Sequence, residues 1–232
     1  MEIIAEIGQN HNGDMMLAKE LIHAAKESGA DIAKFQLFDA LKTFGKNNNP
    51  WFEYNCKTQL SQENLITLYE ECKKADIEFM SSVFNFELID WLEKLNVRRY
   101  KVASRSINDN KLIQSLIELN KPLIISLGHW KEKDFPDFSS NNKISYLYCI
   151  SKYPTELDEL SLSEVDFSKY DGFSDHTLGI NASIIALSRG AKIIEKHFTL
   201  DKNLFGPDHS CSMLPDELMA ISNFKNELKL AL

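Results

Sequence analysis

Cysteine is scarce in this chain of 232 residues, which contains four, Cys56, Cys72, Cys149 and Cys211. No two of them stand at the short spacing that zinc-binding motifs use. A chain of this length can also bury a core without disulfide bonds. We therefore expect neither a disulfide nor a closed structural zinc site, and we interpret the four residues as free thiols in a reducing cytoplasm.

An excess of positive charge and a long apolar run are also missing. Lysine and arginine number 26 against 34 acidic residues, a formal net charge of −8, which argues against a nucleic-acid partner or an anionic membrane surface. No apolar run approaches the roughly 20 residues of a membrane span, and no basic leader precedes the first predicted strand. The sequence thus predicts a soluble, cytoplasmic protein without a membrane partner.

A glycine-rich phosphate loop is absent after the first predicted strand, which argues against a doubly wound nucleotide-binding sheet, the main alternative architecture. Strand and helix patterns instead alternate along the whole chain. The eight predicted strands occupy residues 2–8, 31–38, 77–82, 98–103, 121–126, 144–150, 170–174 and 191–197. Eight such strand–helix units predict a single α/β domain, a (β/α)8 TIM barrel spanning residues 1–232.

Capping residues mark several of the predicted helices. Asp14 and Ser61 are suitable N-cap residues, and Pro215 is suited to the first turn of the last helix. Between the strand at residues 31–38 and the helix that Ser61 caps, the sequence predicts a long polar and aromatic loop that runs through residues 47–52. Residues 131–138 have a poor helical pattern and predict a short, turn-like connection.

Two histidines end consecutive apolar runs near the C-terminus. His176 directly follows Asp175, and His197 stands two residues after Glu195. One histidine at a strand end is usually a structural polar residue, but the same placement in two consecutive units favours a shared site. Two imidazoles surrounded by oxygen ligands suit an octahedral ion such as Mn²⁺ better than a closed zinc site.

The C-terminal ends of the predicted strands carry charged and hydroxyl side chains, and TIM-barrel active sites are built at these ends. Lys34 and Lys101 interrupt apolar runs, where a solvated charge is not expected. Two inward lysines among hydroxyl groups predict a pocket for a phosphate or a carboxylated phosphate ester. The other polar residues at these ends are Glu6, Gln36, Ser81, Ser82, Ser104, Ser126, Ser151, Tyr153, Ser174 and Glu195.

Six segments of the chain resemble the sialic acid synthase family, which includes N-acetylneuraminate, legionaminic acid and pseudaminic acid synthases. They lie at residues 5–13, 34–36, 153–155, 173–179, 195–199 and 206–208. The resemblance implies a TIM-barrel transferase that condenses phosphoenolpyruvate with an N-acetylated amino sugar such as N-acetylmannosamine. The implied products are a nine-carbon 2-keto sugar acid and phosphate, and the implied cofactor is a divalent metal, most often Mn²⁺, with Mg²⁺ or Co²⁺ as alternatives.

The resemblance also implies roles for individual residues. The metal ligands are expected to be His176 and His197. Phosphoenolpyruvate contacts are expected from Lys34, Ser82, Lys101, Ser104, Ser126, Ser151 and Ser174, and contacts to the sugar or to metal-bound water from Gln36, Tyr153, Glu195 and Asp208. Glu6 matches an acidic residue implicated in catalysis. Glu6 and Glu195 are both candidate general bases for the water that attacks C2, and the sequence does not choose between them; the predicted catalytic set is Glu6, Glu195, Lys34 and Lys101.

The chain departs from the family in its length and in a few residues. Full-length members continue into an antifreeze-like domain that caps the sugar site, whereas this sequence ends at Leu232. We therefore expect a sugar site that is open, that is completed by another polypeptide (a second copy in a homodimer or a separate capping-domain protein), or that takes a different acceptor. His129, where the family usually has Met, is interpreted as an ordinary loop residue. His11 is expected to order the first loop and His23 to be structural or solvated, while His209 stays ambiguous.

Two further functions remain open on the sequence alone. One is a catalytically weak or inactive barrel that binds phosphoenolpyruvate and metal and acts beside a partner protein. The other is a phosphoenolpyruvate-dependent aldolase for a phosphorylated sugar. That enzyme would need an arginine cluster to bind the sugar phosphate, and the sequence offers only Arg98, Arg99, Arg105 and Arg189.

Overall fold

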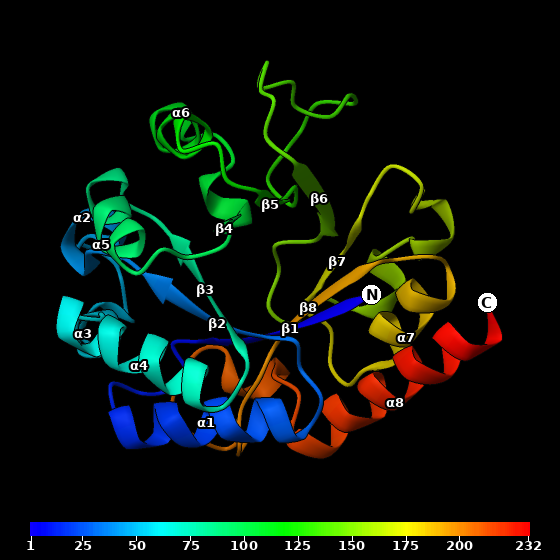
Figure 1. Ribbon diagram of the computed structural model, residues 1–232, viewed down its shortest axis with the longest axis horizontal. Helices are drawn as coiled ribbons and strands as arrows, with labels where there is room; N and C mark the ends of the chain where they lie inside the picture. The colour runs from blue at the N-terminus through cyan, green and yellow to red at the C-terminus, as the bar shows by residue number, and fades with distance from the viewer.

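A computed structural model describes all residues 1–232 and shows a closed barrel of eight parallel strands, each paired with its neighbours in chain order (Figure 1). This confirms the predicted TIM barrel. The strands are β1 Glu2–Gly8, β2 Ile32–Leu37, β3 Glu78–Val83, β4 Tyr100–Val102, β5 Leu123–Ser126, β6 Ile144–Cys149, β7 Gly172–Asp175 and β8 Ile193–His197.

Helices surround most of the barrel. They are α1 Met15–Glu27, α2 Ala40–Phe44, α3 Phe52–Thr58, α4 Gln62–Lys74, α5 Ile89–Lys94, α6 Asn110–Glu118, α7 Asn181–Ser188 and α8 Pro215–Ala231. The predicted caps are present, since the Asp14 carboxylate accepts from the Met16 and Leu17 amides and the Ser61 hydroxyl from the Asn64 amide. None of the helices has the length and apolar character that crossing a membrane requires.

The helical ring is incomplete at β5 and β6, which corrects the expectation of eight regular strand–helix units. Residues between β5 and β6 contain no helix, as predicted for 131–138, and the connection from β6 to β7 holds only the 3-10 turns η3 Leu157–Glu159 and η4 Leu162–Glu164 (Figure 1). Phe135 packs instead against Tyr146 and Tyr170, with ring centroids 5.1 and 4.7 Å apart. Pro136 and the polar residues 139–142 disfavour a helix here.

The region between β2 and α4 also differs from the prediction. Residues 40–44 and 52–58 form the short helices α2 and α3 where a loop was expected. The Asp39 side chain accepts from the Lys42 amide and so caps α2. Trp51 and Tyr54 pack edge to face at 5.7 Å, and this aromatic packing holds the start of α3.

The barrel interior changes from apolar to polar along the strands. One buried apolar cluster fills its lower part, formed by Ile4, Ile32, Met80, Ile124, Leu147 and Ile193. Above it, the register pairs polar residues across adjacent strands, with Glu6 opposite both Lys34 and His197, and Ser174 opposite Glu195. Because side chains alternate in direction along a strand, this register gathers the polar residues at the C-terminal end of the barrel.

Candidate active site

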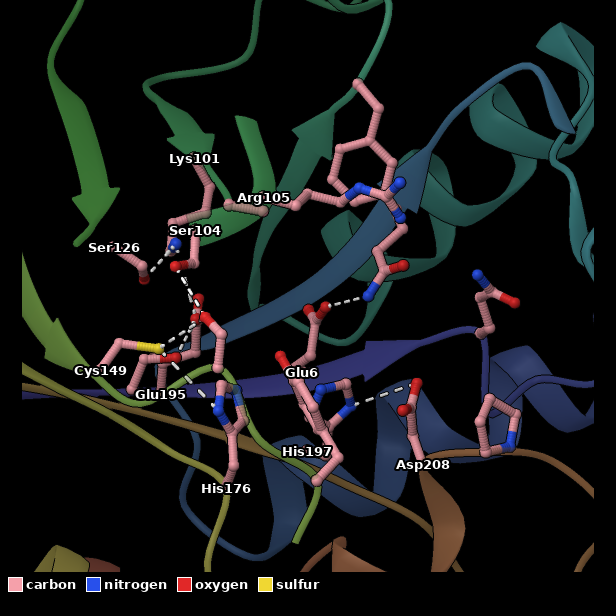
Figure 2. Close-up of a pocket in the computed structure, with 18 of the residues that line it drawn as sticks. Glu6, Lys101, Ser104, Arg105, Ser126, Cys149, His176, Glu195, His197 and Asp208 are labelled. Atoms are coloured by element: carbon pink, nitrogen blue, oxygen red, sulfur yellow. Dashed lines mark hydrogen bonds and ion pairs between the residues drawn. The ribbon is translucent and has the colours of Figure 1, made fainter. Parts of the chain in front are cut away.

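A cavity of about 330 Å³ opens at the C-terminal ends of the strands. Every predicted site residue except Ser82 lines it, as Figure 2 shows for many of them. The cavity therefore lies where a TIM barrel carries its active site. The predicted residues on its wall are Glu6, Lys34, Gln36, Lys101, Ser104, Ser126, Ser151, Tyr153, Ser174, His176, Glu195, His197 and Asp208.

Lys34 is the centre of a buried ionic cluster. Its Nζ lies 2.9 Å from Glu6 Oε2 and 3.1 Å from Glu195 Oε2. It also donates to Ser82 Oγ at 3.0 Å, so Ser82 holds the lysine and does not line the cavity. Burial acts to lower the pKa of Lys34, but the two carboxylates outweigh it and leave the pKa raised. The ammonium is therefore retained at neutral pH.

Lys101 has a different environment, although it is also fully buried. Its Nζ donates to Ser126 Oγ at 2.7 Å and to the Val102 carbonyl at 3.0 Å, and it lies 3.6 Å from Glu195 Oε1. Burial lowers the pKa of Lys101, and the nearby Lys34 charge adds to this effect, against the opposing attraction of Glu195. Lys101 thus has fewer carboxylates close to its ammonium group than Lys34 has. An anion bound beside Lys101 would therefore stabilise its charged form.

Glu195 lies between the two lysines. Burial alone would raise its pKa, but Lys101 and Lys34, with a 2.8 Å hydrogen bond from Ser174 Oγ, lower it to about 2. The carboxylate is therefore ionised at neutral pH. Glu6 is positioned by a different contact, a 2.7 Å hydrogen bond from Gln36 Nε2.

A group of hydroxyls completes the wall beside Lys101. Ser151 Oγ donates to Ser104 Oγ at 2.8 Å, and Ser104 Oγ also accepts from the His129 amide at 2.8 Å. Gly128 allows this close approach, because a Cβ there would lie 2.5 Å from Ser151 Oγ and 2.7 Å from Ser104 Oγ. Lysine charge and directional hydroxyl donors together give a site for a multiply charged oxyanion.

The two predicted metal histidines face the same cavity (Figure 2). Their ring centroids are 6.0 Å apart, and the Tyr153 ring lies 4.0 Å from His176 and 5.9 Å from His197. Burial and the neighbouring His197 lower the pKa of His176 to about 4. Its Nδ1 lies 2.7 Å from the Ile150 carbonyl, which assigns the proton to Nδ1 and leaves Nε2 with a free lone pair.

His197 adds an unpaired ring nitrogen to this region. Its Nδ1 is buried without a hydrogen-bond partner and lies 3.9 Å from Asp208 Oδ2. Two imidazoles that retain lone pairs fit the donor set of a divalent ion whose other ligands are water and substrate oxygens. The protein alone offers no cluster of three histidine, cysteine, aspartate or glutamate side chains for a metal, so a bound ion would keep open coordination positions.

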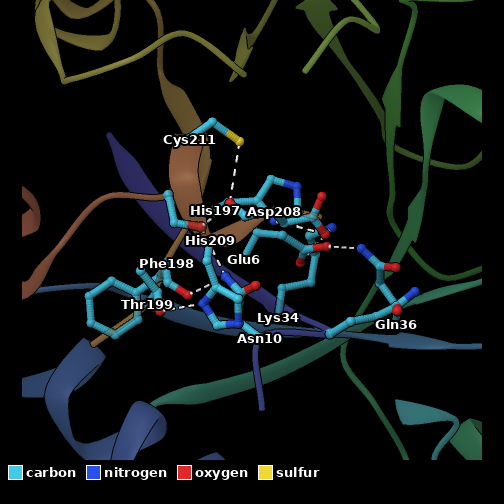
Figure 3. Close-up of polar contacts among 12 residues, drawn as sticks. Glu6, Asn10, Lys34, Gln36, His197, Phe198, Thr199, Asp208, His209 and Cys211 are labelled. Carbon is cyan, nitrogen blue, oxygen red and sulfur yellow. Dashed lines mark hydrogen bonds and ion pairs between the residues drawn. The ribbon is translucent and has the colours of Figure 1, made fainter. Parts of the chain in front are cut away.

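The segment that carries Asp208 is held by contacts to the first loop (Figure 3). Ser212 Oγ donates to the Asp208 carbonyl at 2.7 Å and accepts from Asn10 Nδ2 at 2.9 Å. The same Asn10 amide donates to the Phe198 carbonyl at 2.9 Å. His209 lies 2.7 Å from Thr199 Oγ1 through its Nδ1, and it is a buried part of this support.

The other histidines do not reach the metal region. His11 Nδ1 accepts from the Gly13 amide at 3.1 Å and orders the first loop as expected. His23 lies 3.0 Å from Glu71 on the helical surface. His129 lines the cavity, so the interpretation as an ordinary loop residue was incomplete.

Sequence reasoning missed several residues of the cavity wall. Asn55 and Trp51 come from the segment that was expected to be a loop, and Arg105 and Cys149 come from the ends of β4 and β6. Burial raises the pKa of the Cys149 thiol to about 11, so it is neutral at pH 7. Arg105 and Cys149 could have been found by extending each strand end by a few residues, whereas no local signal marks Asn55.

The fold and the site define a TIM-barrel enzyme with a lysine- and serine-lined anion pocket beside two histidines. Residues 21–232 match the NeuB family. The chain belongs to the NeuB family, which confirms the predicted sialic acid synthase relationship and the predicted class of condensing transferases.

Two curated relatives illustrate the range of the match. The N,N'-diacetyllegionaminic acid synthase of Legionella pneumophila is 41% identical, over 93% of this chain and 68% of its own length. The N-acetylneuraminate-9-phosphate synthase of Drosophila melanogaster is 34% identical, over 96% of this chain and 68% of its own length. The chain thus spans about two thirds of each relative.

A solved structure shows the same architecture. The N-acetylneuraminic acid synthetase from Leptospira borgpetersenii serovar Hardjo-bovis, crystallised with citrate, superposes with a TM-score of 0.89 at 27% identity. The match covers 99% of this chain and 84% of that chain. The Bacillus subtilis spore coat polysaccharide biosynthesis protein spsE matches with a TM-score of 0.82 at 33% identity, over 99% of this chain and 69% of its own.

Proposed function

We propose that this chain condenses phosphoenolpyruvate with the open-chain aldehyde of an N-acetylated amino sugar similar to N-acetylmannosamine. The products would be a nine-carbon 2-keto sugar acid and phosphate. The observation that carries the proposal is the convergence of Lys34, Lys101 and the surrounding serine hydroxyls on one cavity with His176 and His197. Phosphoenolpyruvate carries a phosphate and a carboxylate, and this wall offers charge and donors for both.

In this proposal Lys34, Lys101 and the serine hydroxyls bind phosphoenolpyruvate. Lys101 donates to Ser126 Oγ and has only the more distant Glu195 as a carboxylate neighbour, which leaves it available to a substrate anion. Positioning the enol C3 against the aldehyde carbon converts a bimolecular encounter into a reaction within one complex. The enol π electrons form the bond from C3 to the aldehyde carbon, and the C=O π pair passes to the aldehyde oxygen, which takes up a proton and becomes a hydroxyl. C2 is left electron-deficient and is attacked by water.

Of the two candidate bases for that water, we favour Glu6. Glu195 has a pKa of about 2 because two lysines and Ser174 stabilise its ionised form, and so weak a base takes a proton poorly. Glu6 is oriented toward the cavity by Gln36. Loss of phosphate from the tetrahedral adduct, by cleavage of the C2–O bond, then gives the ketone.

We also propose that His176 and His197 hold a divalent cation, with Mn²⁺ favoured and Mg²⁺ or Co²⁺ as alternatives. The free lone pair on His176 and the unpaired ring nitrogen of His197 support this assignment. When bound, such an ion would supply Lewis acidity to polarise the acceptor aldehyde. Tyr153 and Asp208, beside the two rings, are proposed to orient the sugar and the water around it.

We propose further that a second polypeptide, either another copy of this chain or a capping-domain protein, covers the mouth of the cavity. Phe205 is 72% exposed and packs on Tyr54 at 5.9 Å and at 5.5 Å on Trp51, which lines the cavity. Exposed aromatic residues are typical of interfaces. Sedimentation at increasing protein concentration tests the homodimer, and a monomer at all concentrations leaves the separate capping protein.

Product analysis tests the proposed reaction. Phosphoenolpyruvate, Mn²⁺ and N-acetylmannosamine should yield a nine-carbon keto acid detectable by mass spectrometry. Other N-acetylated amino sugars tested in parallel identify the preferred acceptor. Phosphoenolpyruvate binding without any product from the panel would contradict a self-sufficient synthase and would favour the binding-subunit alternative.

A further inference from the structure

The four arginines of the chain differ in their partners. Arg98 lies 3.6 Å from Glu78, and Arg99 lies 2.8 Å from Glu2 and from Glu78. Arg189 donates to two backbone carbonyls of the loop before β7. Arg105 has no carboxylate partner, and its one hydrogen bond is a 3.3 Å contact from Nη2 to the Thr43 carbonyl.

Arg105 is held at the mouth of the active-site cavity by aromatic rings. It lies in the 3-10 turn η2 Ser104–Ser106, directly after a serine of the anion pocket. Its guanidinium carbon is 4.5 Å from the Phe44 ring centroid and 5.3 Å from that of Phe84. Both rings line the same cavity (Figure 2 shows Arg105 above the pocket). Stacking of this kind orients a guanidinium while its remaining N–H donors stay available.

The carboxylates of the cavity have other partners. Glu6 and Glu195 contact Lys34, and Asp208 lies beside His197. Arg105 therefore adds a positive charge to the cavity that the chain itself does not neutralise. In a protein with a net charge of −8, such an arginine facing a substrate cavity points to an anionic group on a ligand.

We propose that Arg105 forms a second anion subsite at the cavity mouth, separate from the Lys34–Lys101 pocket, which binds a phosphate-type group. This inference rests on the proposed function, because it places an additional substrate contact in the same cavity. The group can come from two sources, the phosphate of the enol phosphate substrate or a phosphate on the acceptor sugar. In the second case Arg105 determines whether the acceptor is a phosphorylated or a neutral sugar.

Arginine suits this task better than a third lysine. The planar guanidinium group of arginine can donate two parallel hydrogen bonds to a phosphate, whereas the ammonium group of lysine binds as a point charge. The backbone amide of His129, which also lines the mouth, donates to Ser104 Oγ at 2.8 Å and so fixes the residue next to Arg105. The subsite is thus attached to the rigid end of β4.

Three variants separate charge from packing. Arg105→Met keeps a long apolar side chain against Phe44 and Phe84 but removes the charge. Arg105→Lys keeps the charge but lacks the planar guanidinium group. Lys192→Ala, at an exposed position before β8, is the control. Calorimetry with four probes, namely inorganic phosphate, phosphoenolpyruvate, N-acetylmannosamine and its 6-phosphate, measures each affinity at low and high salt.

Arg105→Met is expected to weaken the binding of its phosphate ligand at least about tenfold, the effect of losing charge-assisted hydrogen bonds. Arg105→Lys should restore part of the affinity, and the salt dependence of binding should fall in Arg105→Met. Weaker binding of phosphoenolpyruvate and inorganic phosphate identifies the enol phosphate as the source. Weaker binding of the sugar phosphate alone, with N-acetylmannosamine unchanged, identifies the acceptor.

Unchanged affinity of Arg105→Met for all four probes would overturn the subsite, because a packing role alone leaves binding and its salt dependence intact. Lys101→Ala distinguishes this failure from failure of the proposed function. If Lys101→Ala loses phosphoenolpyruvate binding while Arg105→Met keeps the wild-type affinity for all four probes, only the subsite is wrong. If Lys101→Ala also leaves phosphoenolpyruvate binding unchanged, the assignment of the Lys34–Lys101 pocket is wrong as well.

Discussion

Asp175 and Lys196 form a buried ion pair on the outer face of the barrel, with Lys196 Nζ 3.3 Å from Asp175 Oδ2 and both side chains fully inaccessible to solvent. The two residues are register partners on β7 and β8, and each directly precedes one of the cavity histidines. Lys196 also donates to the Thr177 carbonyl at 2.7 Å, and Asp175 accepts from Ser183 Oγ at 2.6 Å. This network fixes the tips of β7 and β8 relative to each other, and with them His176 and His197.

Removing the lysine of this pair should destabilise the protein strongly. Lys196→Ala leaves a buried carboxylate without its counter-charge, a change that typically costs about 3 to 5 kcal/mol of the free energy of unfolding. Urea denaturation measures the loss. Lys73→Ala is the control, since Lys73 pairs at 3.1 Å with Glu70 through side chains that are 58% and 50% exposed. Its midpoint should stay at the wild-type value, and equal effects of the two substitutions would contradict a special role for the buried pair.

Lys101→Ala should weaken phosphoenolpyruvate binding by at least about tenfold, because the variant loses a charge-assisted contact in the anion pocket. The fold should persist, since Glu195 keeps Lys34 as a counter-charge at 3.1 Å and Ser126 is left with a hydroxyl that water can satisfy. Isothermal titration calorimetry measures the affinity, and circular dichroism verifies the fold. An affinity equal to that of Lys192→Ala would remove Lys101 from the substrate pocket.

His197→Ala should sharply weaken Mn²⁺ binding, because only two imidazoles of the chain face this part of the cavity. Electron paramagnetic resonance of free Mn²⁺ during a titration gives the affinity without any measurement of activity. His23→Ala, on the outer surface of α1, should bind Mn²⁺ as the wild type does. Wild-type affinity in His197→Ala would contradict the assignment of the metal ligands.

Stability should fall as the pH drops from about 6.5 to about 4, in part because of His11. Burial lowers the pKa of His11 from 6.5 to about 4. Between these values the unfolded chain takes up a proton that folded His11 does not, so the unfolded state is stabilised relative to the folded state, by at most about 3 kcal/mol for one such group. His176, with a pKa also near 4, contributes in the same direction.

The variant His11→Asn isolates the His11 contribution. Asparagine keeps an acceptor near the Gly13 amide but does not titrate. Urea denaturation at a series of pH values should show a shallower loss of stability in His11→Asn than in the wild type. Parallel curves for the two proteins would show that the environment of His11 does not shift its pKa.

Local signals explain why the barrel could be predicted from the sequence. Strand ends and caps such as Asp14 and Ser61 depend on neighbouring residues only, and the structure reproduces them. The polar residues at the strand ends followed from strand direction, because parallel strands bring their C-terminal ends together. The two histidines were recognisable for the same reason.

Contacts between distant segments explain what the sequence could not reveal. Ser82 was expected on the cavity wall, but its hydroxyl accepts from Lys34 Nζ instead, and this contact depends on the register of two strands. Arg105 is oriented by Phe44 from α2, a helix that was expected to be part of a loop. Asn55 lines the cavity from α3, a helix that the sequence did not predict.

Phosphate release from phosphoenolpyruvate in the presence of Mn²⁺, with and without N-acetylated amino sugars, tests the proposed function most directly. The account predicts little release without a sugar and rapid release with one sugar of the panel, and loss of that release in Lys101→Ala. Sugar-independent release, or none with any sugar although phosphoenolpyruvate binds, would contradict a synthase that acts through this barrel alone.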